Sequence, residues 1–159
     1  MDALTIFERC RSAAGEIRRL NQRIQQRREA MKSAPAPQPD PSGGSRTRAA
    51  TDRTGKMVAD IDALERQLEA RKQARGAELA AACALLDDLP ELESQVLYGY
   101  YIGMESAASM ARRMKYQDSY IRKVRRNGEK LLNELSRDQV AAVLPAWYVH
   151  RYGGDDNEE

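Results

Sequence analysis

Eight lysines and arginines lie between residues 112 and 130, where the only acids are Asp118 and Glu129. The densest part is the run Tyr116–Arg126. This local charge of +6 stands in a chain whose net charge is only +2. Guanidinium and ammonium groups attract phosphates, and a concentrated basic block favours a polyanionic partner. The chemistry that these residues predict is therefore nucleic-acid binding.

The spacing of residues after the run predicts a helix over 118–135. Its apolar face repeats at steps of three and four, as a helix with one buried side requires: Ile121, Val124, Gly128, Leu131, Leu132 and Leu135. Basic residues occupy the opposite face near the start, where the helix dipole adds attraction for phosphate. From the helix and the segment before it we predict the following DNA contacts: Arg112, Arg113, Lys115, Gln117, Asp118, Ser119, Tyr120, Arg122, Lys123, Arg125 and Arg126.

Two shorter helical patterns precede this helix and would hold it in place. The first covers 92–101 and is expected to end at Gly103 in a left-handed cap. The second covers 106–114, begins with Ser106 as an N-cap, and is followed by the turn Lys115–Gln117. Small side chains in the second pattern permit a close helix crossing. Residues 90–136 thus predict a helix-turn-helix domain with a basic last helix.

The sequence pattern of residues 92–135 resembles region four of bacterial sigma factors. The resemblance is carried by Leu92–Met104, Ala108–Tyr116, Ser119–Val124 and Leu131–Leu135. It implies supporting helices and a recognition helix that reads promoter DNA, with Ser119, Tyr120 and Arg122 at the reading edge. Region-four domains also contact RNA polymerase. The family commonly has Ser or Thr as the cap of that helix, whereas Gln117 stands here, so we expect the helix to start at Asp118.

The preceding part of the chain predicts a long antiparallel coiled-coil helical hairpin over 1–89. A basic helix over 3–33 and an acidic one over 54–88 carry apolar residues at heptad-like steps. The segment 34–53 is expected to be a flexible linker, because prolines alternate in it and Gly-Gly follows. A short helix and a disordered acidic tail are expected in 137–159. This organisation resembles small phage and prophage proteins, including late transcription regulators of the RinA and ArpU type.

Other classes of protein are disfavoured by the composition. The chain has two cysteines and one histidine, Cys10, Cys83 and His150, with no metal-ligand spacing and no Gly-rich phosphate loop. We therefore expect no enzyme activity, no metal and no cofactor. No apolar run is long enough to span a bilayer, so we expect no membrane association and a location in the cytoplasm of a bacterial host cell.

The leading hypothesis is an all-α, sequence-specific transcription regulator that binds double-stranded DNA with its basic helix in the major groove. The sequence also predicts a homodimer or a higher homo-oligomer, because a single small domain makes few DNA contacts. Two alternatives stay open. One is a phage DNA-packaging protein like a small terminase subunit, and the other is an interaction protein that binds RNA polymerase.

Overall fold

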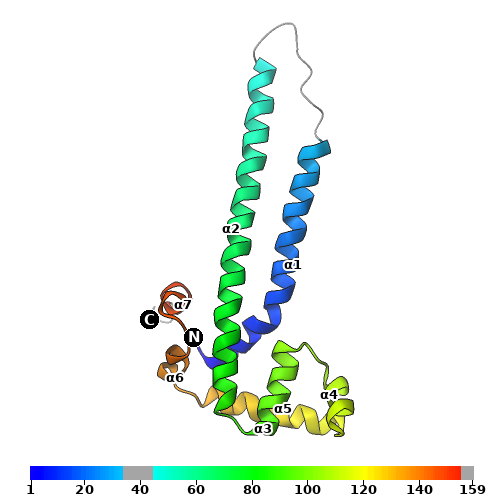
Figure 1. Cartoon of the computed structure of the whole chain (residues 1–159), viewed down its shortest axis with the longest axis vertical. Helices are drawn as coiled ribbons and strands as arrows, with labels where there is room; N and C mark the ends of the chain where they lie inside the picture. Colours follow the sequence, from blue (N-terminus) through cyan, green and yellow to red (C-terminus); the bar gives the residue numbers. More distant parts are fainter. Residues whose placement is uncertain (34–44, 155–159) are drawn as a thin grey trace, which may run out of the picture. The chain divides into compact units, whose positions relative to one another are not determined.

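A computed structural model of the chain describes residues 1–33 and 45–154, with the backbone alone for residues 45–51. All regular structure in these ranges is helical, which confirms the predicted all-α class (Figure 1). No helix in them is both long enough and apolar enough to cross a membrane. The helices are α1 (Ala3–Ser33), α2 (Ser45–Asp87), α3 (Glu91–Leu97), η1 (Tyr98–Ile102), α4 (Ala107–Met114), α5 (Asp118–Asn133), α6 (Arg137–Ala142) and α7 (Ala146–Tyr152).

The predicted bounds agree with the structure for α1 but not for the start of α2. Helix α1 has the predicted bounds, and Asp2 caps it by accepting a 2.7 Å hydrogen bond from the backbone N–H of Thr5. Helix α2 begins at Ser45, nine residues before the predicted Thr54. The expected linker is therefore shorter, because residues after the last proline and glycine contain good helix formers such as Ala49 and Ala50. Its proline-rich part, 34–44, lies outside the described residues.

Helix α3 ends differently from the prediction. It continues into η1, a wide π-helical turn in which the Gly103 N–H donates to the Tyr98 carbonyl at 2.9 Å. Gly103 is right-handed (φ −77°), and the left-handed residue is Met104 (φ 56°). The predicted left-handed cap at Gly103 is wrong, because the wide turn displaces the reversal by one residue. Gly103 is instead packed closely, since a Cβ there would lie 3.1 Å from the Gly99 carbonyl oxygen.

The chain divides into two compact units, and each of the two long helices has one part in each unit. Unit 1 comprises Met1–Ala14 and Gln73–Glu159, and unit 2 comprises Gly15–Lys72. The boundaries at 89 and 136 remain predictions from the sequence. The start of α1 and the end of α2 share a buried core with α3, η1, α5 and α6.

The main core of unit 1 combines residues from the first and last parts of the chain. Its buried members come from α1, α2, α3, η1, α5 and α6: Ala3, Ile6, Phe7, Cys10, Ala81, Ala82, Leu85, Leu86, Leu97, Tyr101, Leu132 and Val140. Phe7 and Tyr101 meet edge to face, with ring centroids 5.7 Å apart. A second cluster joins α3 to α4 and α5 through Val96, Met110, Ala111, Ile121 and Val124. The apolar face of α5 therefore packs into the second cluster along its first half and into the main core along its second half.

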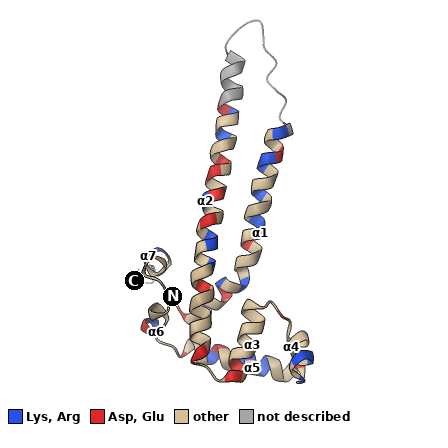
Figure 2. Ribbon diagram, in the orientation of Figure 1, with Lys and Arg blue, Asp and Glu red and all other residues tan. Residues whose placement is uncertain are grey.

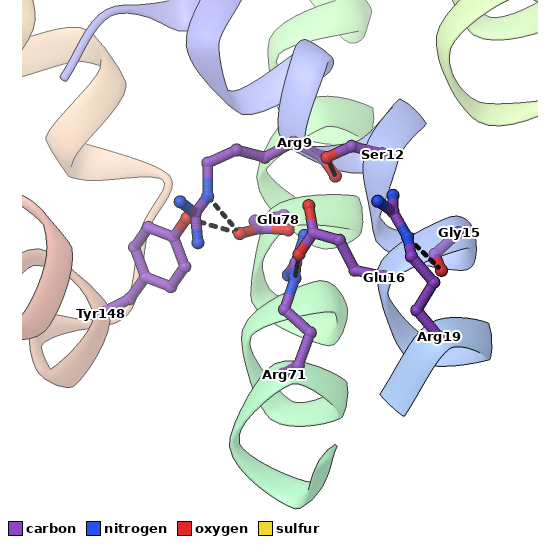
Figure 3. Close-up of polar contacts among 8 residues, drawn as sticks. All are labelled: Arg9, Ser12, Gly15, Glu16, Arg19, Arg71, Glu78 and Tyr148. Atoms are coloured by element: carbon purple, nitrogen blue, oxygen red, sulfur yellow. Dashed lines mark hydrogen bonds and ion pairs between the residues drawn. The ribbon is translucent and has the colours of Figure 1, made fainter. Parts of the chain in front are cut away.

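The C-terminal helices α6 and α7 belong to unit 1, where α6 has a side-chain cap and α7 has a buried tyrosine that its sequence alone does not indicate. Ser136 starts α6 with a reciprocal capping box to Gln139. Tyr148 of α7 is fully buried, and its hydroxyl donates a 2.7 Å hydrogen bond to Glu78 Oε1. Arg9 donates to the same oxygen at 2.6 Å, so α1, α2 and α7 meet at one buried carboxylate (Figure 3). Burial, with the hydrogen bond to Glu78, raises the pKa of the Tyr148 hydroxyl. The predicted acidic tail, 155–159, lies outside the described residues.

Unit 2 consists of two antiparallel helical segments with few buried side chains. Ile24 of α1 and Ile61 of α2 are its buried aliphatic residues among those described. Ion pairs join the segments: Arg71 to Glu16 at 2.6 Å, Arg27 to Asp60 at 3.0 Å, and Arg28 to Glu65. The earlier residue of α1, Glu16, pairs with the later residue of α2, Arg71, and Arg27 pairs with the earlier Asp60, so the two segments are antiparallel.

Candidate nucleic-acid interface

Helix α4 presents two of the predicted DNA-contacting arginines. The Ser106 side chain caps the helix, as predicted, by accepting from the Ser109 N–H at 3.1 Å. Met110 and Ala111 bury one face against α5. Arg112 and Arg113 in the last turn therefore point to solvent, and both are exposed. Lys115 then ends the helix in the left-handed conformation (φ 60°).

Helix α5 begins at Asp118, one residue after Gln117. Gln117 is extended (φ −83°, ψ 150°) and its side chain makes no capping hydrogen bond. The Tyr120 and Ile121 N–H groups donate to the Gln117 carbonyl, whereas the N–H groups before them have no side-chain cap and can bind an anion. Asp118 is an acid in this first turn, where it favours the helix through the dipole. This geometry places Ser119 and Tyr120 within the first turn.

The two faces of α5 are separated as the sequence predicted. Ile121, Val124, Gly128 and Leu132 are buried. Gln117 and Asp118 at the start are exposed, and so is most of the predicted reading face: Ser119, Tyr120, Arg122, Lys123 and Arg126. At 3.6 residues per turn, Ser119, Lys123 and Arg126 fall along one stripe of the helix. Lysines and arginines colour this part of α5 and the end of α4 blue in Figure 2.

Most cations of this region have no acidic partner. Arg113 is the exception on α4, because its guanidinium donates to Glu105 at 3.0 Å and 3.3 Å. The other outward cations among the predicted DNA contacts form no ion pair with any residue in the described ranges, and together we call them the basic surface: Arg112, Lys115, Arg122, Lys123 and Arg126. Cations without an acidic partner can exchange water for phosphate without breaking an ion pair. Arg112 makes one internal hydrogen bond, from its Nε to the Ala108 carbonyl at 3.5 Å. The basic surface is therefore available to a polyanion.

Arg125 departs from the predicted face. Its guanidinium carbon lies 4.2 Å from the centroid of the Tyr100 ring, and its side chain is only 28% exposed. Its Nε lies 3.4 Å from Glu129 Oε1 but is buried and donates no hydrogen bond within residues 1–33 and 45–154. Arg125 therefore packs against the body of unit 1, whereas its neighbour Arg126 faces outward.

The contacts around Arg125 tie α5 to the start of the chain. Arg11 of α1 also lies over the Tyr100 ring, at 3.9 Å, and donates a 2.5 Å hydrogen bond to the Tyr100 carbonyl. Glu129 of α5 accepts a 2.7 Å hydrogen bond from the Tyr101 hydroxyl. Burial, reinforced by this hydrogen bond, raises the pKa of the Tyr101 hydroxyl. This network lies behind the exposed face and fixes the rotation of α5.

Close helix contacts also position α5. A Cβ on Gly128 would lie 2.8 Å from Leu97 Cδ1, so α5 approaches α3 more closely than a larger side chain permits. A Cβ on Gly99 would lie 2.6 Å from Met110 Sδ, which makes the contact between η1 and α4 similarly tight. Both glycines are buried. The outward presentation of Arg122 and Arg126 thus rests on a tightly packed support.

Tyr116 belongs to this surface although it was absent from the predicted contacts. Its ring is 45% exposed and lies 5.0 Å from the ring of Tyr120, which is 41% exposed. The spacing of four residues between two aromatic side chains beside the basic run was the available signal. Because tyrosine is common in cores, that spacing alone did not separate an exposed pair from a buried one.

Little in the described residues suggests another kind of site. They contain no group of three or more His, Cys, Asp or Glu side chains that could hold a metal ion. A pocket of about 360 Å³ lies beside α6 and α7, lined in part by Arg137, Asp138 and Tyr148. It shares no residue with the basic surface.

Comparisons with protein families, with curated protein sequences and with solved structures found no match to this chain.

Proposed function

We propose that this protein is a sequence-specific transcription regulator that binds double-stranded DNA, with α5 in the major groove. The observation that carries the proposal is the separation of charge on α5. Arg122, Lys123 and Arg126 face outward without acidic partners, while the opposite face is buried in unit 1. A helix with one tightly packed side and one unpaired basic side fits the dimensions of the groove.

The proposed contacts follow from the position of each residue. Ser119, Arg122 and Arg126 lie where the start of a recognition helix meets base edges. Lys115 and Arg112 precede α5 and would bind phosphates on the flanking backbone. The uncapped N–H groups of the first turn add a further site for a phosphate. These roles make α3 with η1 the support, α4 the first helix and α5 the second helix of a sigma region-four-like helix-turn-helix.

We further propose that two copies bind paired half-sites and that a coiled-coil hairpin in unit 2 joins them. Unit 2 supports this arrangement because its aliphatic side chains are poorly covered. Leu20, Leu64 and Leu68 are only half-buried, and Val58 is 44% exposed. A second copy would cover this surface. A phage or prophage origin is part of the proposal and rests on the sequence resemblance.

The test begins with selection of a binding site from a random pool of duplex DNA. Binding of the full chain to that site is then measured by fluorescence anisotropy. Arg122→Ala and Arg126→Ala are each expected to weaken binding by about 1–3 kcal/mol if the side chain contacts bases. The matched control is Arg66→Ala, an exposed arginine on α2, which is expected to bind as the original chain does.

The salt dependence of binding separates DNA from a protein partner. Affinity should fall steeply as salt rises, because each neutralised phosphate releases counterions. Unchanged affinity in both Arg122→Ala and Arg126→Ala would sink the proposal. Capture of RNA polymerase by a chain that shifts no DNA would select the interaction protein, and a ring oligomer in sedimentation would favour the packaging protein.

A further inference from the structure

Two exposed tyrosines lie side by side at the start of α5. The ring centroids of Tyr116 and Tyr120 are 5.0 Å apart, and the ring planes are tilted by 49°. The pair comes from the turn before α5 and from its first turn. Its backbone is held by hydrogen bonds from the Tyr116 N–H to the Ala111 carbonyl at 2.9 Å and from the Tyr120 N–H to the Gln117 carbonyl at 3.0 Å.

Packing within the protein does not account for this pair. Neither ring belongs to either hydrophobic cluster of unit 1. Neither hydroxyl makes a hydrogen bond to the parts of the chain that the structure describes. In contrast, the buried hydroxyls of Tyr101 and Tyr148 each donate to a glutamate. Two aromatic rings that remain about half in water are an apolar surface with no internal partner.

The surroundings of the pair select a polyanion. Lys115 precedes Tyr116, and Lys123 lies one turn after Tyr120 on the neighbouring stripe of α5. Both lysines are exposed and belong to the basic surface. An apolar patch bounded by unpaired cations fits the major groove better than an apolar protein surface, because the cations would have to lose water in an apolar interface.

We infer that Tyr116 and Tyr120 read the 5-methyl group of a pyrimidine in the major groove. This inference rests on the proposed function, because it requires α5 to enter that groove. Among the groups at the base edges of the groove, the thymine methyl is the apolar one, and apolar side chains contact it. The two tilted rings present adjacent apolar surfaces at the helix end that meets the bases. The ligand class is thus thymine or 5-methylcytosine.

The experiment removes the methyl group from the DNA and leaves the protein intact. Each thymine of the selected duplex is replaced singly by deoxyuridine, and binding of the full chain is measured by anisotropy. At one position we expect about a fourfold loss of affinity, the effect of burying one methyl group. Replacing that thymine–adenine pair by 5-methylcytosine–guanine, compared with cytosine–guanine, should favour the methylated duplex by a similar factor.

Protein variants then assign the methyl preference to the tyrosines. Tyr120→Ala and Tyr116→Ala should each reduce the preference for thymine over deoxyuridine toward one, and Tyr120→Phe should retain it. Arg122→Ala is the matched control, because it should weaken binding to both duplexes and leave their ratio unchanged. Thermal unfolding of each variant establishes that it is folded.

The outcomes separate the inference from the proposed function. Normal duplex binding with no preference for thymine at any position overturns the inference and leaves DNA binding intact. A preference that survives both alanine variants also overturns it. Tighter binding to single-stranded than to duplex DNA, lost in the alanine variants, would show stacking on unpaired bases instead. Absence of binding to any duplex overturns the proposed function itself.

Discussion

Two cationic regions of this protein use their arginines in different ways. In unit 2, Arg27, Arg28 and Arg71 each form an ion pair with an acid on the other helical segment. On α5, Arg122 and Arg126 form no ion pair with any described residue. Unit 2 also carries exposed arginines that form no ion pair with any described residue, such as Arg18 and Arg23, but its arginines that face the other helical segment are neutralised there. The position of the acids, more than the number of cations, thus decides which arginines are neutralised within the protein.

A third case is the buried carboxylate of unit 1, where the paired cation is Arg9. Glu78 is fully buried and accepts from Arg9 and from the Tyr148 hydroxyl. We predict that Glu78→Ala lowers the free energy of unfolding by about 3 kcal/mol, because it leaves a buried hydroxyl and a half-buried guanidinium without their acceptor. Denaturant unfolding measures this loss. Glu65→Ala, at an exposed pair, is the control and should cost far less; equal losses would contradict the distinction.

Arg125 and Arg126 are adjacent on α5, but Arg125 packs against the body of unit 1 and Arg126 faces outward. Arg125→Ala should lower the free energy of unfolding by about 1 kcal/mol, because it removes the contact with the Tyr100 ring and the partner of Glu129. It should leave the salt dependence of DNA binding unchanged. Arg126→Ala should do the reverse, with stability kept and the slope of log affinity against log salt reduced by about 1. If the two variants behaved alike, the division of α5 into an inner and an outer arginine would be wrong.

The exposed ion pairs of unit 2 should show the smallest effect. For Arg27 and Asp60, both about half exposed, a double-mutant cycle should give a coupling free energy of about 0.2–1 kcal/mol. Thermal or denaturant unfolding of the two single alanine variants and the double variant supplies the cycle. Neither single variant should alter DNA affinity. A loss of affinity on removing Arg27 would mean that unit 2 also binds the nucleic acid.

The sequence predicted local features well. The bounds of α1, the Ser106 cap and the start of α5 at Asp118 all follow from short-range rules, and the structure confirms them. Capping depends on side chains within three residues of the helix end, so it can be inferred from sequence alone. The buried face of α5 could also be predicted from the sequence, because its apolar residues repeat with the period of an α-helix.

Features that depend on distant residues were not predictable in the same way. Arg125 lies near the border of the apolar face, and its inward position is decided by Tyr100, in a different helix. The burial of Tyr148 is decided by Glu78, seventy residues earlier. The misplaced left-handed residue after η1 had a different cause, since a π-helical turn has no strong sequence signal.

The discontinuous make-up of unit 1 has a consequence for synthesis on the ribosome. Ile6 and Phe7 leave the ribosome long before Leu132 and Val140, with which they are buried. These native neighbours are therefore missing until the segment that contains α5 and α6 has been made. Contacts of such large sequence separation slow folding, and they leave early apolar side chains exposed in the meantime. The packing that holds α5 in place can therefore form only after residues far apart in the sequence have both been made, and a product that lacks either segment would lack the native support for its basic helix.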